Sequence, residues 1–389
     1  MRIVIVSITV LVGLSAVGIF MLGPGLAENR VNAVIAHDPY TVTDRAKQLH
    51  GELFVADLHA DSLLWRRDLR RSAARGHVDI PRLQAGNVAL QVFSATTKSP
   101  SGLNYNGNRA DARDDITALA LVQRWPVATW HSLYARAEYQ LTKLIELSTA
   151  VPGQLQLIQT QTDLNDLLKR RSNGEPIIGA LYLIEGAHPL EGNLANLDRL
   201  FDRGLRIIGL VHFFDNDVAG SLHGLKRPGL TDFGRQVVRR AEELGMIIDI
   251  AHASPRAVSD VLDMATRPVL LSHGGLRGHC PSPRNLDDDL MRRMASAGGL
   301  IGIGFWKGAI CDASPDGVVA AIRYAIDTLG VDHVALGSDF DGAVTVAFDA
   351  SELAVLTERM LIAGFTEKEI AAVMGGNVQR FLSTQLPAQ

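Results

Sequence analysis

The fold is decided by residues 246–273, which read MIIDIAHASPRAVSDVLDMATRPVLLSH. The stretch predicts a strand over 246–250, a helix that begins at Ser254 and Pro255, and a second strand over 269–271. Proline suits the first position of a helix, where its missing N–H would have no partner. Continuous apolar runs are typical of strands buried on both faces of a parallel sheet. The stretch therefore predicts one strand–helix–strand unit.

Short apolar runs of the same kind recur along the chain, with helical patterns between them. Helices are expected over 231–244, which has Thr231 at its start and Gly245 after its end, and over 318–329, which follows a Ser-Pro pair at 314–315. The expected strands, eight in all, are 53–58, 88–93, 177–184, 205–211, 246–250, 269–271, 300–303 and 333–336. Eight strands alternating with helices predict an α/β fold, a (β/α)8 TIM-like barrel.

The alternative is an open, doubly wound sheet. That fold usually carries a glycine-rich phosphate-binding turn after its first strand, whereas here the first strand is followed by His59, Ala60 and Asp61. Residues 94–176 are too long for a simple crossover, so we expect one or two additional helices there, including 113–147. We therefore favour the barrel.

The composition indicates a globular protein with a large core. Of the 389 residues, 47% are hydrophobic and 21% are charged, which excludes a wholly disordered chain. The 38 basic and 42 acidic residues give a net charge of −4, so the sequence gives no support for nucleic-acid binding. Two cysteines are too few for a disulfide-dense scaffold or a cysteine-rich zinc finger. Any metal site must therefore be built from the 12 histidines and the carboxylates.

The N-terminus carries an uncharged, mostly apolar run over residues 3–27, and about 20 such residues span a bilayer. Arg2 precedes the run, so a transmembrane helix here would anchor the chain with its body outside the cytoplasm, on the periplasmic or extracellular side. A cleaved signal peptide, and hence a secreted protein, is the alternative, because residues 25–27 form a small-x-small site. We divide the chain into an anchor or signal segment 1–27, a connecting segment 28–50 and a barrel domain 51–385.

Side chains with metal-binding or acid–base chemistry stand at the ends of six of the eight expected strands. In a barrel, the carboxyl ends of the strands and the loops after them form the face that carries the active site. These residues are His59, Asp61, Glu185, His212, His252, His273 and Asp339. A lone histidine at a strand end is usually structural, but six such coincidences on one rim indicate a shared site.

His59 and Asp61 are two residues apart on the first strand, so both side chains point the same way and can face one metal ion. Imidazole and carboxylate ligands suit zinc and other divalent ions. With Glu185, His252 and His273 they make five ligands, whereas a catalytic zinc usually takes three from the protein. Two ions that share Glu185 fit better, and such a pair can activate a bridging hydroxide for hydrolysis.

Other residues near this rim are given weaker roles. Asp57 faces the same way as His59 and is a candidate to support the site from behind. His188 is not expected to be a ligand, because the glycine and proline that flank it make a helix there unfavourable. No role is assigned to His279. The histidines expected off the rim, as structural or solvated residues, are His77, His131, His223 and His333.

Taken together, the sequence resembles the membrane dipeptidase (renal dipeptidase) family of zinc peptidases, in a bacterial-type form. The matching pieces run in family order from about residue 50 to 381 and together are highly specific. They are DLHAD at 57–61, IEG at 184–186, LVH at 210–212, DIAHAS at 249–254, LSH at 271–273, RN at 284–285, GSDFDG at 337–342 and GGN at 375–377.

The resemblance implies a (β/α)8 barrel with two zinc ions per chain. It implies His59 and Asp61 on the first zinc, His252 and His273 on the second, and Glu185 between the two. By the same matching, the residues with catalytic or substrate-binding roles are His212, which contacts the substrate and its tetrahedral intermediate, Arg284, which binds the substrate's terminal carboxylate, and Asp339, the acid–base partner. The implied activity is zinc-dependent hydrolysis of dipeptides through a metal-bridging hydroxide.

The chain also departs from the mammalian members of that family. Residues 97–150 do not align with them, and only Cys280 and Cys311 remain of their several cysteines. We expect these two to form a disulfide, because they follow the sixth and seventh strands near one face of the barrel and export permits oxidation. Two buried free thiols are the alternative. The last four residues carry no apolar tail, so any membrane attachment is expected through residues 3–27.

Two other functions stay open at this stage. A lactonase or phosphotriesterase-like binuclear hydrolase would commonly use a carbamylated lysine as its bridge, but Lys169 and Lys226 do not end a strand. A membrane-tethered binding protein without activity would be expected to have lost ligands, and all five are present. Arg284 without the resemblance would be interpreted as a surface residue paired with the acidic residues at 287–289. A homodimer is kept open beside a monomer.

Overall fold

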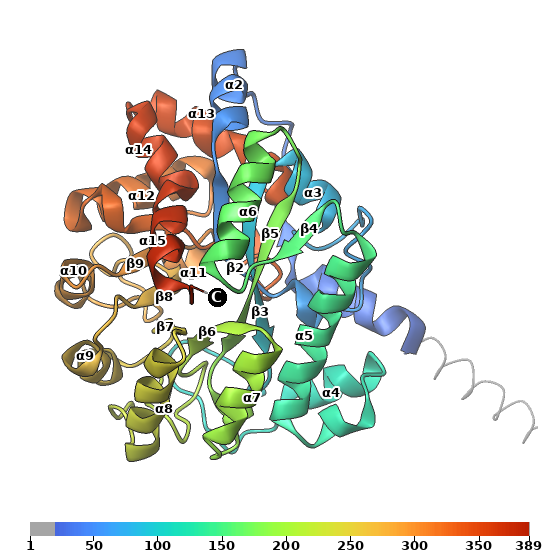
Figure 1. Cartoon of the computed structure of the whole chain (residues 1–389), viewed down its shortest axis with the longest axis vertical. Coiled ribbons are helices and arrows are strands. Elements are labelled where there is room, and N and C mark those ends of the chain that lie inside the picture. Colours follow the sequence, from blue (N-terminus) through green and yellow to red (C-terminus); the bar gives the residue numbers. More distant parts are fainter. Residues whose placement is uncertain (1–19, 389) are drawn as a thin grey trace, which may run out of the picture.

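Eight parallel strands close into a barrel in the computed structural model, which describes residues 20–388 (Figure 1). Neighbouring strands pair in sequence order around the ring, and the last barrel strand pairs with the first to close it. The barrel strands are β2 Val55–Ala60, β3 Val88–Thr96, β5 Ile178–Glu185, β6 Leu205–Gly209, β7 Ile247–Asp249, β8 Leu270–Gly274, β9 Leu300–Ile303 and β10 Val334–Leu336. All eight overlap the expected strands, so the predicted (β/α)8 class is confirmed.

The helices that follow the strands lie around the outside of the barrel, where Figure 1 shows α7 to α10 and α12 spread along the periphery. They begin where the sequence predicts, because Thr231, Ser254 and Ser314 each accept a hydrogen bond from the backbone N–H three residues further on. These helices are α3 Ile80–Ala85, α7 Ala195–Arg203, α8 Asp232–Glu243, α9 Pro255–Met264, α10 Asp288–Ser296, α11 Lys307–Ile310 and α12 Pro315–Leu329.

The connection between β3 and β5 is longer than a simple crossover. It consists of α4 Asp115–Val122, α5 Leu133–Ala150, a short strand β4 Leu155–Leu157 that pairs with β5, and α6 Gln161–Ser172. The expected pattern over 113–147 is split at Pro126, which precedes a short 3-10 turn, Val127–Trp130. A proline disfavours helical backbone at the residue before it, so the pattern over 113–147 forms two helices instead of one. With α6 as the crossover helix, α4 and α5 are the additional helices, and the expectation of one or two is confirmed.

The C-terminal helices complete the structure and pack against the barrel. They are α13 Ala354–Ile362, α14 Glu367–Ala371 and α15 Asn377–Gln385. Val378, Phe381 and Leu382 of α15 belong to a buried apolar cluster that has members on all eight barrel strands. The last helix is therefore part of the core of the barrel domain.

The N-terminal part of the described chain is packed onto the domain. Residues 20–31 are helical, and β1 Ala33–Val34 and α2 Asp44–Glu52 follow. β1 pairs in parallel with β11 Thr345–Val346, a short strand in the loop after β10. Within residues 20–388, none of the helices combines the length and the apolar character of a membrane crossing. Most of the predicted anchor or signal segment, residues 1–19, lies outside the described residues.

Candidate metal centre and active site

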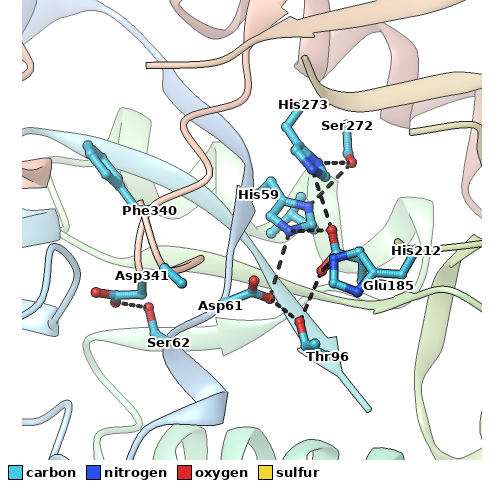
Figure 2. A network of polar contacts seen from close by, with 12 residues as sticks. His59, Asp61, Ser62, Thr96, Glu185, His212, Ser272, His273, Phe340 and Asp341 are labelled. Atoms are coloured by element: carbon cyan, nitrogen blue, oxygen red, sulfur yellow. Dashed lines mark hydrogen bonds and ion pairs between the residues drawn. The ribbon is translucent and has the colours of Figure 1, made fainter. Parts of the chain in front are cut away.

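The carboxyl ends of the barrel strands carry a cluster of histidines and carboxylates (Figure 2). His59 lies near the end of β2, Asp61 directly follows that strand, and Glu185 is the last residue of β5. His273 belongs to β8, and the loops after β6, β7 and β10 provide His212, His252 and Asp339. All seven side chains are at most 8% exposed. The structure therefore brings together the whole set that the sequence assigns to this rim.

Two of these residues have a left-handed backbone. The φ angle is 63° at His252 and 61° at Asp339. Such angles are uncommon for residues other than glycine and cost free energy, so the surrounding structure must hold them. The loops after β7 and β10 thus place these two side chains at some cost in backbone strain.

Glu185 lies at the centre of the cluster. Its Oε1 is 3.0 Å from His252 Nε2 and 3.4 Å from His273 Nε2. The same oxygen is 3.7 Å from His59 Nε2, and the other oxygen, Oε2, is 3.3 Å from His212 Nε2. One carboxylate therefore faces four imidazoles that come from four different strand ends.

The ligand atoms form overlapping trios within this cluster. Three trios have all their atoms within 4.8 Å of one another: His59 with Asp61 and Glu185, Glu185 with His212 and His252, and His59 with His273 and Asp339. In addition, His252 Nε2 and His273 Nε2 are 3.0 Å apart, beside Glu185 Oε1. Two of the trios share Glu185, and a carboxylate that serves two cations must lie in such a position.

The electrostatics of the cluster favours positive charge near its carboxylates. Burial opposes protonation of His59, but Glu185 and Asp61 outweigh this effect and raise the pKa of His59 to about 10. Burial is the main cause that lowers the pKa of both His252 and His273 well below the usual value. These two imidazoles are therefore neutral, which is the form that binds metal ions.

Ser272 and Asp249 orient two of the histidines from behind. Ser272 Oγ donates a hydrogen bond of 2.6 Å to Asp249 Oδ2. It also lies 2.9 Å from His273 Nδ1 and 3.3 Å from His59 Nδ1 (Figure 2). Contacts to Nδ1 leave Nε2 of each ring free to face the cluster. Neither supporting residue was predicted from the sequence.

Asp57 does not have the supporting role that the sequence suggests for it. Its carboxylate accepts hydrogen bonds from Ser338 N, Ser338 Oγ and Gln91 Nε2, each of 2.7 Å. These bonds join β2 to β3 and to the end of β10. Asp57 therefore stabilises the closure of the barrel beneath the site and makes no hydrogen bond to His59 among the described contacts.

Arg284 lies inside the cluster. Its side chain is 3% exposed, and Nη2 donates a hydrogen bond of 3.1 Å to His273 O and lies 3.4 Å from His252 Nε2. The guanidinium carbon is 5.4 Å from the centre of the Trp306 ring. The alternative of a surface arginine paired with the acidic residues at 287–289 is therefore wrong.

Asp339 is the most strongly perturbed carboxyl group of the site. Burial raises its pKa well above the usual value, against the opposing charge of His59 and with a further contribution from Glu185. Its carboxylate lies within 4.8 Å of ligand nitrogens of His59 and His273. A buried carboxyl group with a raised pKa therefore lies beside the cluster.

The remaining histidines lie largely where the sequence places them. The His188 ring packs against that of Phe214 at an angle of 41°, with ring centres 4.6 Å apart, and His188 belongs to none of the trios. His77 is structural, because its Nδ1 accepts a hydrogen bond of 2.9 Å from Asp341 N. His223 is the exception, since it is fully buried with its ring centre 5.4 Å from that of His252. Of the other histidines considered above, His131 is exposed, and His279 and His333 lie outside the cluster.

A cavity of about 560 Å³ opens onto the metal-binding cluster. Thr96 and Trp306 line it although the sequence analysis passed over both. Thr96 Oγ1 lies 3.2 Å from Asp61 Oδ1 and 3.0 Å from Glu185 Oε2, so its single O–H can donate to either carboxylate. Thr96 ends β3 and Trp306 follows β9, the two strands to which no site residue was assigned. Thr96, a polar residue at the end of β3, could have indicated this role from the sequence.

Cys280 and Cys311 are joined by a disulfide with an Sγ–Sγ distance of 2.02 Å. The bond links the loop after β8, which carries Arg284, to the segment after β9, which carries Trp306. Asn285 Nδ2 strengthens the same link by donating to Cys280 O at 3.0 Å and to Ala309 O at 2.7 Å. The loop that holds the buried arginine is thus covalently fixed.

Buried imidazoles and carboxylates that converge on the rim of a parallel barrel define a metal-dependent hydrolase. The model of one such family, the membrane dipeptidases of peptidase family M19, matches residues 43–388. The chain belongs to this family. It is a metallopeptidase that hydrolyses the peptide bond of dipeptides.

Relatives from several kingdoms share this similarity. An uncharacterized dipeptidase of Schizosaccharomyces pombe is 29% identical over 322 residues, 79% of this chain and 73% of the relative. Dipeptidase 3 of Mus musculus is 26% identical over 358 residues, 87% of this chain and 65% of the relative. A solved metallopeptidase of Rhodobacter sphaeroides, bound to a phosphinate mimic of the dipeptide L-Ala-D-Ala, has a TM-score of 0.70 at 23% identity over 86% of this chain and 99% of its own. That last likeness shows a common fold.

Proposed function

We propose that this dipeptidase uses two zinc ions, one held by His59 and Asp61 and one by His252 and His273, with Glu185 shared between them. The observation that carries the proposal is the position of Glu185, whose Oε1 lies 3.0 to 3.7 Å from three imidazole nitrogens of the two groups. A carboxylate in that position can serve two cations at once.

The donor set fits zinc. His59 Nε2 is buried and has no hydrogen-bond partner among the described residues, although two carboxylates lie beside it. Buried polar atoms are normally satisfied, so this nitrogen fits a metal ligand. Neutral imidazoles together with carboxylate oxygens are ligands that zinc prefers.

The residues of the chain then position a dipeptide against the metal ions. Bound ions of this kind lower the pKa of a water molecule and polarise a substrate carbonyl. Arg284 binds the free carboxylate of the substrate through charge-assisted hydrogen bonds. Because Arg284 Nη2 is only 3.4 Å from His252 Nε2, the carboxylate is held close to the scissile bond, which favours dipeptides over longer chains.

His212 and Asp339 carry the charge and proton movements. His212 lines the cavity beside Glu185 and donates to the carbonyl oxygen as negative charge develops there, which stabilises the transition state. Asp339 accepts the proton of the attacking water and passes it to the leaving amine. Both residues belong to trios that also contain metal ligands, so each lies within reach of the reacting bond.

The alternative of a lysine-bridged hydrolase has no support in the arrangement of the site. Lys169 is exposed on α6, and Lys226 is exposed in the loop after β6. Neither residue lines the cavity that opens onto the cluster. Glu185 occupies the bridging place instead.

A metal analysis combined with a substrate panel tests the proposal. The purified chain should contain close to two zinc ions and should hydrolyse free L,L or L,D dipeptides, with N-acetylated dipeptides, a lactone and a phosphotriester as controls. Removal of the metal by a chelator should abolish the activity, and zinc should restore it. One ion per active chain would overturn the shared role of Glu185.

We further propose that residues 3–27 attach the enzyme to a membrane with the barrel outside the cytoplasm. The uncharged run and the Cys280–Cys311 disulfide, which suits an oxidising compartment, support this location. Fractionation of cells that express the full chain, with mass analysis of its N-terminus, tests it. Intact protein that stays with membranes at high salt is expected, whereas a chain cleaved after Ala27 would mean secretion.

A further inference from the structure

One side of the active-site cavity is apolar and includes the N-terminal helix. This side, here named the apolar wall, consists of Ala27, Val31, Leu64, Trp65, Ile116 and Leu119. Ala27 and Val31 belong to the helix over residues 20–31, yet they line the same cavity as Glu185. Val31 packs against the buried cluster that contains the wall residues Leu64, Trp65 and Ile116. Ala27, the last residue of the proposed anchor segment, and Val31, four residues after it, therefore form part of the substrate cavity.

Buried ion pairs hold this helix in place. Glu28 is 1% exposed, with Oε1 3.1 Å from Arg67 Nε and Oε2 accepting a hydrogen bond of 2.7 Å from Arg75 Nε. Arg67 also pairs with the buried Asp341. Removing one partner of a buried pair is strongly destabilising, so the helix is fixed and not merely resting on the domain.

The residues after the helix are joined to the loop that carries Asp339. Asn32 Oδ1 accepts a hydrogen bond of 2.8 Å from Ala343 N. The next two residues form β1, which pairs with β11 at the end of that loop. In addition, Trp65 Nε1 donates a hydrogen bond of 2.7 Å to Asp341 O, so the largest ring of the apolar wall is fixed to the same loop. The wall is therefore a built part of the site.

The apolar wall and Arg284 adjoin different ligand groups of the cluster. The wall residues Leu64 and Trp65 follow Asp61 directly through the turn Ser62–Leu64, whereas Arg284 contacts His252 on the opposite group of ligands. A dipeptide whose carboxylate binds Arg284, and whose scissile bond lies at the cluster, directs its amino-terminal residue toward Asp61 and the wall.

We propose that the apolar wall receives the side chain of the substrate's amino-terminal residue and selects bulky apolar side chains. The inference rests on the proposed function, because it takes Arg284 as the carboxylate site. It makes the helix over residues 20–31 a specificity element of the enzyme, with Val31 as its central contact.

Substitutions at Val31 in the full chain test this role. Val31→Asp places a charge in the wall, and Val31→Ala removes contact without adding charge. Ile35→Asp is the matched control, since Ile35 is 50% exposed and does not line the cavity. For each protein, kcat/KM is measured on leucylglycine, phenylalanylglycine, serylglycine and glycylglycine, together with metal content and Tm.

The parent is expected to prefer the two apolar substrates by about tenfold or more, the discrimination that an apolar pocket provides. Val31→Asp should remove that preference mainly by raising KM for the apolar pair, Val31→Ala should reduce it, and Ile35→Asp should leave it unchanged. If Val31→Asp fails to fold, the comparison of Val31→Ala with Ile35→Asp decides the question.

A parent that hydrolyses the panel without apolar preference would overturn the inference. So would metal-loaded Val31 variants that keep the parent's ratio between apolar and polar substrates. A parent that hydrolyses none of the dipeptides would instead overturn the proposed function on which the inference rests.

Discussion

Replacing Arg284 with alanine should remove recognition of the substrate's carboxylate and leave the metal centre in place. Among the described contacts, only Nη2 of the guanidinium is bonded to protein, at His273 O, so its other N–H groups remain for the substrate. A hydrogen bond to a charged group contributes about 1.5–3 kcal/mol. A loss of about 3 kcal/mol in transition-state stabilisation corresponds to a fall in kcat/KM on the order of 100-fold.

The assay compares a free dipeptide with its amide, which lacks the carboxylate, for the parent and for Arg284→Ala. The parent should be much poorer on the amide, and the variant should lose little more there, because the interaction is already absent. Arg284→Lys keeps the charge without the planar fork and should give an intermediate result. Equal losses on acid and amide, with metal content unchanged, would refute the assignment of Arg284 to the carboxylate.

Three further results are expected. Glu185→Gln should weaken both metal sites, whereas His252→Ala should mainly empty one; metal analysis that finds two ions and full activity in Glu185→Gln would contradict the shared centre. Replacing Cys280 and Cys311 together by alanine should lower the free energy of unfolding by about 3–4 kcal/mol on the chain-entropy model, for the 31-residue separation, and an unchanged denaturation midpoint would argue against this. Asp249→Asn should weaken metal affinity by about 10–100-fold, because the hydrogen bond through Ser272 no longer orients the histidines. Chelator competition measures this affinity, and a value like that of the parent would show that the support from Asp249 is dispensable.

The barrel and the histidines and carboxylates gathered at its rim could be predicted because their signals are local. The run over 269–271 is apolar throughout and the run over 246–250 is apolar except for Asp249, as is typical of strands buried on both faces, and a histidine follows each run two residues after its end. Barrel geometry then brings strand ends together without any knowledge of side-chain contacts. His59, Glu185 and His273 follow from that rule.

The parts that the sequence did not predict depend on contacts between distant segments. β1 and β11 have two residues each, too few to show a pattern, and they pair Ala33 with Thr345. The burial of His223 against His252 depends on the folding of the loop after β6, which carries no periodic signal. The role of Asp249 could not be predicted for a different reason. An acidic residue inside an apolar run gives no indication that it accepts a hydrogen bond from Ser272 on the next strand.

The pairing of β1 with β11 also bears on the order in which parts of the chain can fold during synthesis. A chain is made from its amino terminus, so residues 33–34 exist long before the Thr345–Val346 strand to which they bind. Asp61 and Glu185 are likewise made well before His252, His273 and Asp339, and β2 must wait for β10 before the ring can close. Contacts of such long sequence separation form slowly and late. A partly synthesised chain therefore has no complete metal centre, and hydrolytic activity can begin only when nearly the whole polypeptide has been made.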